Sequence, residues 1–485
     1  MAHAPPPLIE ELLPIAILVG VVAIVTSLLP KVDVGHSAAF RRRRLLNWLP
    51  LGLTYAFLYM ARYNLSVLKS NGVITQADFG TIDGVGSLVY GVSFLLNGPL
   101  TDRFGGRFSI LVAAGGTLVA TTAMGIMFHQ GSVTVTGLML LYSANMYFQS
   151  FGAVSIVKVN ASWFHLRERG TFGGIFGILI SLGLYFAYDW GARILQLTAT
   201  PGVDAAHPTY HGEWLCFVPA AILAVFWVLS FLLVRDTPEQ AGLASFEVGD
   251  ASTGQSRAKE SAVAVIIRMM SNPIILTIAF VELCSGFLRQ GILKWFPDFA
   301  GGMHLGDSYI MRHWGMMSCI AGIVGGIFAG AISDHLFGSR RAPVASVLYG
   351  LMLAGALLII PLFGTPTLIG GVVVVMAMAI IGVHGMLSGV ASQDFGGRLN
   401  AGVAVGLIDG FVYLGSSIQS FVYGATLPEK GTAAAAQAGN WIWWPGAMIP
   451  VAVIGFLLAL RLWNARVQPK SAPFVPQAID VTKSK

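Results

Sequence analysis

The chain has 485 residues, of which 55% are hydrophobic and only 11% are charged, and its formal net charge is +6. Soluble domains carry charge on about a quarter of their residues, so this composition excludes a soluble globular protein. The long apolar runs also lack the two-residue alternation of a transmembrane β-barrel. Since no water reaches the hydrocarbon core, each run is predicted to cross the bilayer as a helix. The basic residues are interpreted as topology signals of cytoplasmic loops, not as a nucleic-acid surface.

The first predicted membrane helix covers residues 12–29, an uncharged run long enough to span a bilayer. Glu10 and Glu11 precede it, and Lys31 and the basic cluster 41–44 follow it. A cleaved signal peptide would carry its positive charge before the apolar run. We therefore interpret residues 1–44 as an extra N-terminal transmembrane helix, with its N-terminus outside the cell, and a basic cytoplasmic connector.

Twelve further spans are predicted after this helix. The longest polar stretch, residues 235–272, falls between the sixth and the seventh of them. It is interpreted as a cytoplasmic linker between an N-terminal six-helix bundle over residues 45–234 and a C-terminal one over residues 273–465. Residues 466–485 form a basic tail, which is predicted to be cytoplasmic. Thirteen crossings agree with an N-terminus and a C-terminus on opposite sides.

An internal repeat relates the two predicted bundles. The loop after the second of the twelve spans contains Gly98 and Asp102, and the loop after the eighth contains Gly330 and Asp334 at the same spacing. The same offset of about 230 residues relates Arg169 to Arg398 and Arg62 to Arg289. Pseudo-symmetric halves of this kind are common in transporters, and the substrate site usually lies between them.

The repeated loops are predicted to hold the two bundles at the cytoplasmic face. The glycines would let neighbouring helices approach closely, and the aspartates would bind arginines or cap helix ends. Such contacts can hold one conformation and release it in the other; the alternative is a topology anchor with no gating role. The predicted gating residues are Gly98, Asp102, Arg103, Arg107, Glu168, Arg169, Asp334, Arg340, Arg341 and Arg398.

Two arginines are predicted to lie inside the membrane. Arg62 follows an uncharged run over residues 45–61, which places it about 20 Å from the cytoplasmic end of its helix, and Arg289 lies at a similar depth. A charge at mid-bilayer costs at least about 2.5 kcal/mol. We expect the two side chains to face each other across a central cavity, where their guanidinium groups would bind a phosphate or carboxylate. The alternative is that each extends toward the membrane surface or pairs within its bundle.

Other polar residues in the spans are weaker candidates for this site. Lys158 and Lys294 either line the cavity or reach toward the surface. His384 either binds substrate or packs, Glu282 is interpreted as a counter-charge rather than a proton site, and Asp409 caps or pairs. Hydroxyl or amide contacts are predicted for Tyr59, Tyr63, Asn64, Tyr90 and Tyr413.

Several of these residues belong to motifs that resemble the organophosphate:phosphate antiporter family of the major facilitator superfamily. The matching segments are Arg62-Tyr63-Asn64, Asp78-Phe79-Gly80, Tyr90-Gly91-Val92-Ser93, Trp163-Phe164, Glu168-Arg169-Gly170, Leu288–Trp295, Ile381–His384 and Tyr413-Leu414-Gly415. The resemblance covers residues 45–463. It implies a major facilitator fold, two phosphate-binding arginines at Arg62 and Arg289, and exchange of an organic phosphate for inorganic phosphate by a rocking-bundle mechanism.

Departures from the family cluster at the predicted site. Tyr63 and Phe94 stand where the bacterial antiporters have lysines, Lys294 replaces an aspartate, and Cys319 occupies an acidic position. The substrate therefore stays open between organic phosphates and other small anions. A proton-coupled symporter of organic carboxylates and a transporter-like sensor of sugar phosphates remain alternatives.

The sequence does not predict an enzyme. It contains no P-loop, no Gly-x-Ser-x-Gly elbow, no HExxH motif and no cluster of metal ligands. We expect no cofactor, no metal and no nucleic-acid partner. The predicted protein is a monomer in the cell membrane whose partners are the lipid bilayer and a small anion, an organic phosphate or inorganic phosphate.

Overall fold

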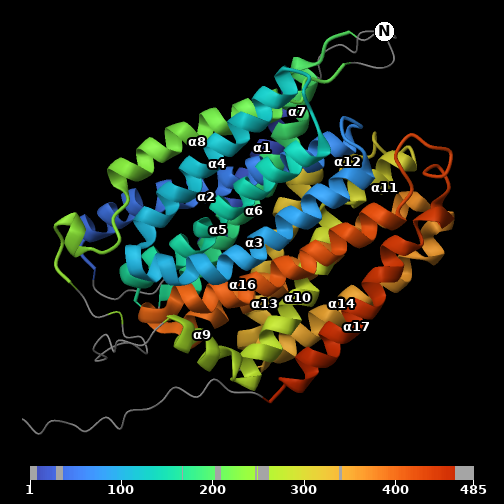
Figure 1. Ribbon diagram of the computed structural model, residues 1–485. Coiled ribbons are helices and arrows are strands. Elements are labelled where there is room, and N and C mark those ends of the chain that lie inside the picture. The colour runs from blue at the N-terminus through green and yellow to red at the C-terminus, as the bar shows by residue number, and fades with distance from the viewer. Residues whose placement is uncertain are drawn as a thin grey trace, which may run out of the picture.

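The computed structural model describes residues 8–28, 36–165, 168–201, 209–245, 248, 262–337 and 341–464. Every regular element in these ranges is a helix, and the long helices lie side by side (Figure 1). An isolated antiparallel β-bridge pairs the backbones of Thr200 and Thr209. The structure is therefore the all-helical one that the composition predicts.

The N-terminal half of the chain forms seven long helical segments, the sixth of which is continued by a π-helical turn and a short helix. These elements are α1 (Leu8–Leu28), α2 (Ala38–Ser70), α3 (Gln76–Phe104), α4 (Gly106–His129), α5 (Val135–Trp163), α6 (Arg169–Tyr185), η2 (Phe186–Trp190), α7 (Gly191–Thr198), α8 (Trp214–Leu233) and the 3₁₀ turn η3 (Glu239–Ala241).

The C-terminal half begins with a short helix and then forms six long segments. Its elements are α9 (Ala262–Met270), α10 (Pro273–Leu293), α11 (Phe296–Gly302), α12 (Tyr309–Arg312), α13 (Trp314–Phe337), α14 (Arg341–Ile359), η4 (Pro361–Gly364), η5 (Pro366–Leu368), α15 (Ile369–His384), η6 (Gly385–Ala391), α16 (Ser392–Thr426), η7 (Ala438–Trp441) and α17 (Trp443–Arg461).

Nine segments of the described chain are long and apolar enough to cross a membrane. They are α3, α4, α6 from Gly177 through α7, α8, α10 with α11, α14, α15, α16 and α17. Shorter apolar stretches lie in α1 and α13. The helices α2 and α5, which carry the buried polar side chains of Arg62 and Gln149, are not among the nine. A polytopic membrane protein is thus confirmed, whereas the predicted count of thirteen spans is supported only in part.

Local sequence signals explain where several helices begin. Ser37, Thr75, Thr134 and Asn272 precede α2, α3, α5 and α10, and the side-chain oxygen of each accepts a hydrogen bond from a backbone N–H two or three residues later. An N-cap of this kind stabilises a helix by about 1 kcal/mol, because it satisfies an N–H group that has no partner inside the helix.

Glycines permit close helix contacts, including those that join α16 to α3 and to α10. A Cβ atom on Gly98 of α3 would lie 2.5 Å from the Gly402 carbonyl oxygen, and one on Gly286 of α10 would lie 1.8 Å from the Val412 carbonyl oxygen. The close approach predicted at Gly98 is confirmed. At Gly330 a Cβ would meet nothing within 4 Å among the described residues, and parts of its loop lie outside them, so close approach there stays a prediction.

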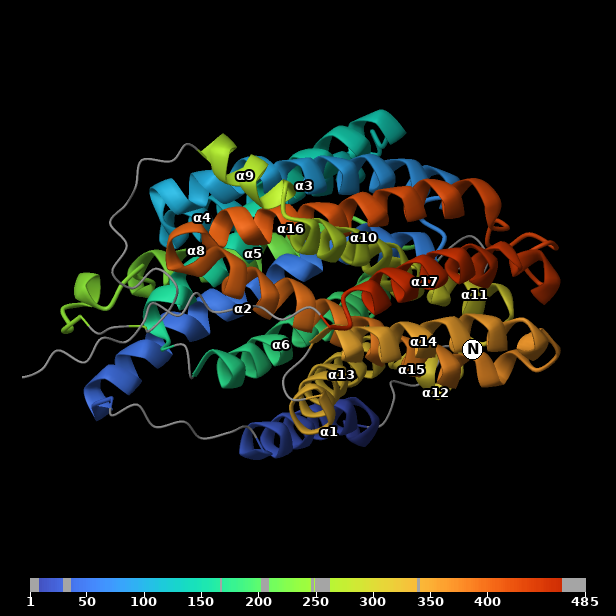
Figure 2. The same ribbon diagram turned by 90° about the horizontal axis from the view of Figure 1, so that it is seen from below.

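The extra helix α1 packs across the place where the two halves meet. Leu18 lies in a small apolar cluster with Ile178 and Tyr185 of α6 and with Met316 and Ile323 of α13. Figure 2 shows α1 at the edge of the molecule, next to α13. The helix therefore contacts both six-helix halves and not only the N-terminal half to which it is joined.

The glycine contact between α10 and α16 yields a test of the packing. We expect Gly286→Ala to lower the free energy of unfolding by about 1–3 kcal/mol, the usual cost of overpacking, because the Val412 carbonyl belongs to a helix backbone that cannot move aside alone. Thermal unfolding of the purified protein in detergent measures this. Gly371→Ala, at an exposed position of α15, is the matched control, since a Cβ there would meet nothing within 4 Å. Equal melting temperatures for the two variants would contradict the packing.

Candidate functional site

Arg62 lies in the last third of α2, and its guanidinium group is held by neutral groups. Nε donates to Gln149 Oε1 at 2.8 Å, Nη1 donates to the Tyr413 hydroxyl at 2.8 Å, and Nη2 donates to the Tyr90 hydroxyl at 2.6 Å. The side chain is 2% exposed. Each hydroxyl accepts from the guanidinium and keeps its own proton to donate, so the positive charge of Arg62 is oriented without being neutralised.

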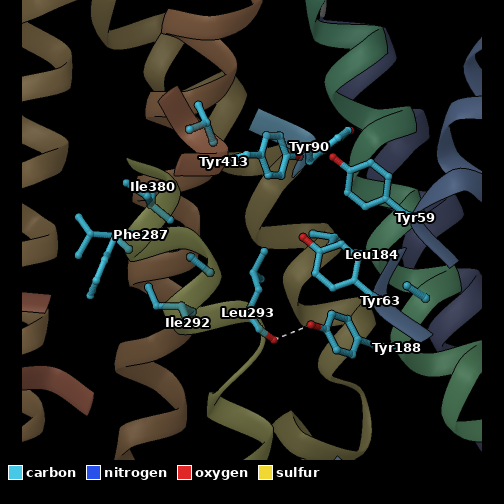
Figure 3. Close-up of a cluster of buried hydrophobic side chains, with 14 of the residues drawn as sticks. Tyr59, Tyr63, Tyr90, Leu184, Tyr188, Phe287, Ile292, Leu293, Ile380 and Tyr413 are labelled. Carbon is cyan, nitrogen blue, oxygen red and sulfur yellow. Dashed lines mark hydrogen bonds between the residues drawn. The ribbon is translucent and has the colours of Figure 1, made fainter. Parts of the chain in front are cut away.

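Tyrosine rings surround the same charge. The Cζ atom of Arg62 lies 4.6 Å from the ring centre of Tyr59, 4.8 Å from that of Tyr90 and 5.8 Å from that of Tyr413. Figure 3 shows these three rings converging from opposite halves of the molecule. A cation over an aromatic face gains about 0.5–2 kcal/mol, which offsets part of the cost of burying the charge.

A polar network on α5 fixes the backbone and side chain of Arg62. Gln149 Nε2 donates to Asn145 Oδ1 at 3.0 Å, and Asn145 Nδ2 donates to the Ala61 carbonyl at 2.8 Å. The Tyr142 hydroxyl lies 2.9 Å from the Arg62 carbonyl oxygen. Sequence reasoning missed this network, although Asn145 and Gln149 are four residues apart on one face of an otherwise apolar helix.

The second buried arginine, Arg289 of α10, has unsatisfied hydrogen-bond donors. Its Nε and Nη2 atoms are buried and have no hydrogen-bond partner in the described part of the chain. Its guanidinium interacts electrostatically with Tyr413 and Tyr59, which also surround Arg62, and with Tyr63 and Glu282. Leaving a buried donor unsatisfied costs about 1–3 kcal/mol, and more for a charged group. The two arginines, one from each half, therefore approach a common set of tyrosines, and one has free donors.

Two buried lysines differ from the arginines, because each forms an ion pair with a carboxylate. Lys69 Nζ lies 2.7 Å from Asp298 Oδ2, and Lys294 Nζ lies 2.6 Å from Asp83 Oδ2. Ser420 Oγ also donates to Asp83, at 2.6 Å. Both pairs join the N-terminal half to the C-terminal half. Lys294, predicted to bind substrate or to reach the surface, is thus bound to a protein carboxylate.

Further contacts close the molecule at the end that contains Lys69 and Asp298, here called the Lys69 end. The backbone N–H of Gln76 donates to Glu429 Oε1 at 2.8 Å, and Lys430 Nζ binds the Ser70 carbonyl. Figure 3 shows the hydrogen bond of 2.7 Å from the Tyr188 hydroxyl to the Leu293 carbonyl. Every one of these contacts crosses between the halves, so in this conformation the halves meet at the Lys69 end.

The opposite end, here called the Asp102 end, carries the repeated loop of the N-terminal half. Asp102 Oδ1 lies 2.7 Å from Lys158 Nζ, and its carboxylate accepts from the backbone N–H groups of Gly402 at 3.3 Å and Val403 at 3.1 Å. Asp102 therefore binds a lysine and the backbone of α16, where an arginine or a helix end was expected. Lys158, predicted as a candidate for the substrate site, lies at this contact.

The rest of the loop is attached to the end of α8. The backbone N–H of Arg107 donates to Asp236 Oδ1 at 2.7 Å, and its Nη2 donates to the Phe231 carbonyl at 2.7 Å. Gly105 has a φ of 94°, and a Cβ there would lie 2.5 Å from Asp236 Oδ2. Burial raises the pKa of the Asp236 carboxyl group, which the Arg107 N–H partly offsets. Arg103 lies over the ring of Phe104 at 5.4 Å.

The remaining predicted gating residues divide into described and undescribed ones. Glu168 accepts hydrogen bonds from Arg44 at 2.9 Å and from the His165 backbone N–H at 3.1 Å, and His36 Nε2 lies 3.4 Å from it. Arg341 begins α14. Arg340 and the side chains of Arg169, Asp334 and Arg398 lie outside the described residues. The gating contact predicted for the repeated loop of the C-terminal half therefore stays a prediction.

Two other predicted site residues have partners of their own. Tyr63 donates to Gln290 Oε1 at 3.1 Å and lies between Tyr59 and Tyr188 (Figure 3). Asn64 Nδ2 donates to Cys216 Sγ at 3.6 Å, away from the partners of Arg62.

His384 instead lies on the Arg289 side of the site. Its Nδ1 is 2.9 Å from Glu282 Oε2, so Glu282 faces a histidine as well as Arg289.

The ion pair of Lys294 with Asp83 yields a test of the closed end. We expect Lys294→Gln to destabilise the protein by about 3–5 kcal/mol, because it leaves the Asp83 carboxylate buried without its cation. Adding Asp83→Asn removes that charge and is expected to recover most of the loss. A double-mutant cycle of unfolding free energies measures the coupling. Additive effects of the two substitutions would contradict the pairing.

Residues 51–420 match the family model of the Major Facilitator Superfamily. The glycerol-3-phosphate transporter of Bacillus subtilis is 29% identical over 409 residues, 79% of this chain and 86% of that one. The membrane sensor protein UhpC of Salmonella typhimurium is 25% identical over 457 residues, 90% and 95% of the two chains. A probable hexose phosphate transport protein of Chlamydia trachomatis is 22% identical over 444 residues, 86% and 90%.

Solved structures share the fold. A bacterial homolog of the human lysosomal transporter Spinster, inward-facing and unoccupied, superposes with a TM-score of 0.63 at 14% identity, and the match covers 88% of this chain and 97% of that one. The nucleoside transporter NupG superposes with a TM-score of 0.54 at 16% identity, covering 86% and 98%. The relatives found by sequence are named as phosphate-ester transporters and a membrane sensor, and the resemblance to organophosphate antiporters stated from the sequence is confirmed.

Proposed function

The chain belongs to the Major Facilitator Superfamily, and from this premise we propose that it is a secondary transporter that exchanges a small organic phosphate for inorganic phosphate. One observation supports the proposal above all others. The buried cations Lys69 and Lys294 each have a carboxylate partner, whereas Arg62 and Arg289 form no ion pair among the described residues. Two guanidinium groups that have no direct ion-pair partner among these residues are the proposed receptor for a divalent anion.

The chemistry of the site fits a phosphate group. A phosphate monoester carries close to two negative charges at neutral pH, which two arginines offset. Guanidinium donors bind phosphate in a bidentate manner, and such charge-assisted hydrogen bonds are about twice as strong as neutral ones. Arg289 offers the buried Nε and Nη2 donors, and Tyr90 and Tyr413 offer hydroxyl protons beside Arg62. His384 is the further candidate ligand on the Arg289 side.

The relatives support the same class of substrate. Their names include glycerol-3-phosphate and hexose phosphate, which share the phosphoryl group and differ in the organic part. In this chain the surroundings of the organic part differ from those of the family pattern. Tyr63 and Tyr59 present aromatic rings, and Lys294 is held by Asp83. We propose that these aromatic rings contact the organic part, while the phosphoryl group binds both arginines.

The two ends of the molecule support a rocking-bundle mechanism. In this conformation, ion pairs between the halves occupy the Lys69 end, and Asp102 binds the α16 backbone at the other end. We propose that the Lys69 end faces outside and the Asp102 end the cytoplasm of the plasma membrane. The N-terminus is then outside, the C-terminus cytoplasmic, and one chain is sufficient. Opening the Lys69 end requires that the buried pairs separate, so substrate binding must compensate for their loss.

A second candidate function is sensing of a sugar phosphate. It is favoured by the similarity to the membrane sensor protein UhpC, which extends over 90% of this chain. The same arginine site would then bind the ligand, and the change in conformation would be passed to a partner protein. Binding of the organic phosphate without exchange distinguishes this function from transport.

Exchange in proteoliposomes tests the proposed transport. Vesicles loaded with unlabelled phosphate are expected to take up labelled phosphate, and external glycerol-3-phosphate is expected to compete. Arg62→Lys and Arg289→Lys each keep the charge and lose the bidentate donors. Each is expected to weaken phosphate binding roughly 10- to 100-fold, since hydrogen bonds to charged groups contribute about 1.5–3 kcal/mol. Arg461→Lys, at the exposed end of α17, is the matched control.

The same assay separates the alternatives. Uptake that needs no internal phosphate would contradict exchange. Wild-type binding in the arginine variants would contradict the site. Binding that depends on both arginines, with no exchange in any direction, would favour the sensor.

A further inference from the structure

We propose that Glu282, His384 and Asp409 form a proton-binding site next to Arg289, and that the protein takes up about one proton with each divalent phosphate that it binds. This inference rests on the proposed function, because the anion is what draws the proton. It assigns a role to two buried carboxyl groups and a partly buried histidine, for which phosphate binding by the arginines alone provides none.

Glu282 is the centre of this cluster. It precedes Arg289 by seven residues, two turns along the same face of α10, and its side chain is fully buried. Oε2 lies 2.9 Å from His384 Nδ1, whereas Oε1 is buried and has no hydrogen-bond partner among the described residues. One oxygen is therefore free to carry a proton.

Asp409 supplies a second carboxylate from another helix. It lies in α16 and is 6% exposed, and Ser388 Oγ donates to its Oδ1. It interacts electrostatically with His384, Glu282 and Arg289. Three helices, α10, α15 and α16, thus bring two acids and a histidine into the surroundings of Arg289.

Few other charged or titratable groups face this cluster. Tyr349 of α14 interacts with Glu282, but its hydroxyl proton is already donated to the Val281 carbonyl. Cys284 lies on α10 itself, and Tyr413 of α16 faces Arg289. The described charges of the other helices packed on α10 are Arg268 near the end of α9, Asp298 of α11 and Arg461 in the last turn of α17. Tyr55 of α2 also interacts with Asp409.

Charge balance leads from this geometry to proton uptake. Without substrate, Arg289 already has the carboxyl groups of Glu282 and Asp409 in its surroundings. A phosphate dianion adds two negative charges to the same buried region, where an uncompensated charge is costly. A proton from solvent on a carboxylate, or on the His384 ring, reduces the excess. By linkage, the proton and the anion then favour each other's binding.

The coupling has a consequence for transport. In strict exchange, each anion arrives with a proton and leaves with one, so the cycle moves no net proton when both anions are divalent. Movement of the anion in one direction only would carry protons with it. The cluster therefore permits exchange without net proton movement.

Direct proton counting tests this inference. Purified protein in weak buffer at pH 8 is mixed with glycerol-3-phosphate, which is almost fully divalent there because its second pKa is about 6. A pH-indicator dye is expected to report uptake of about one proton per bound anion, with binding measured in parallel by calorimetry. Glu282→Gln and Asp409→Asn are expected to lower the uptake at least twofold while binding persists. Asp307→Asn, an exposed carboxylate away from the cluster, is the matched control and is expected to keep it.

Each outcome decides between the proposals. Binding by the wild type without proton uptake would overturn the proton site and leave the phosphate site intact, and this result does not depend on any variant folding. Unchanged uptake in Glu282→Gln and Asp409→Asn would also overturn it. Failure of the wild type to bind both glycerol-3-phosphate and inorganic phosphate would overturn the proposed function and this inference with it.

Discussion

The cost of an unpaired charge inside a membrane is the constraint on which the account depends. Even the more lenient scales assign about 2.5–3.5 kcal/mol to an arginine at mid-bilayer. The chain buries both Arg62 and Arg289 and surrounds them with tyrosines rather than with ion-pair partners. Tyrosine hydroxyls and rings orient a guanidinium and lower its cost without cancelling its charge. The arrangement is stable enough to fold and still attracts an anion.

The other buried charges show that the protein is able to neutralise a cation where no anion is needed. Lys69 and Lys294 are bound by Asp298 and Asp83, and both pairs hold the two halves together at one end. At the opposite end, Asp102 binds Lys158 and the backbone of α16. The buried charges near the two ends of the molecule thus form ion pairs that join its parts, whereas Arg62 and Arg289 between the ends form none with the described residues. The helix α1, which contacts α6 and α13, spans the same junction between the halves.

Part of this arrangement was predictable from the sequence, because a charge inside an apolar run indicates a functional site and a glycine there indicates close helix packing. The burial of Arg62 and Arg289 and the close approach at Gly98 follow from local patterns. Partners of long side chains do not, since Lys158 and Lys294 find their carboxylates far along the chain. The repeated loops also differ in their described contacts: Gly98 packs against the backbone of α16, whereas a Cβ on Gly330 would meet no described neighbour.

The most direct test of the central claim is a cryo-electron microscopy structure of the protein with glycerol-3-phosphate bound. The account predicts a phosphoryl group that lies between Arg62 and Arg289 and accepts hydrogen bonds from both guanidinium groups, with the Nε and Nη2 atoms of Arg289 now satisfied. A phosphoryl group bound elsewhere, or arginine side chains turned toward lipid and away from the ligand, would contradict it.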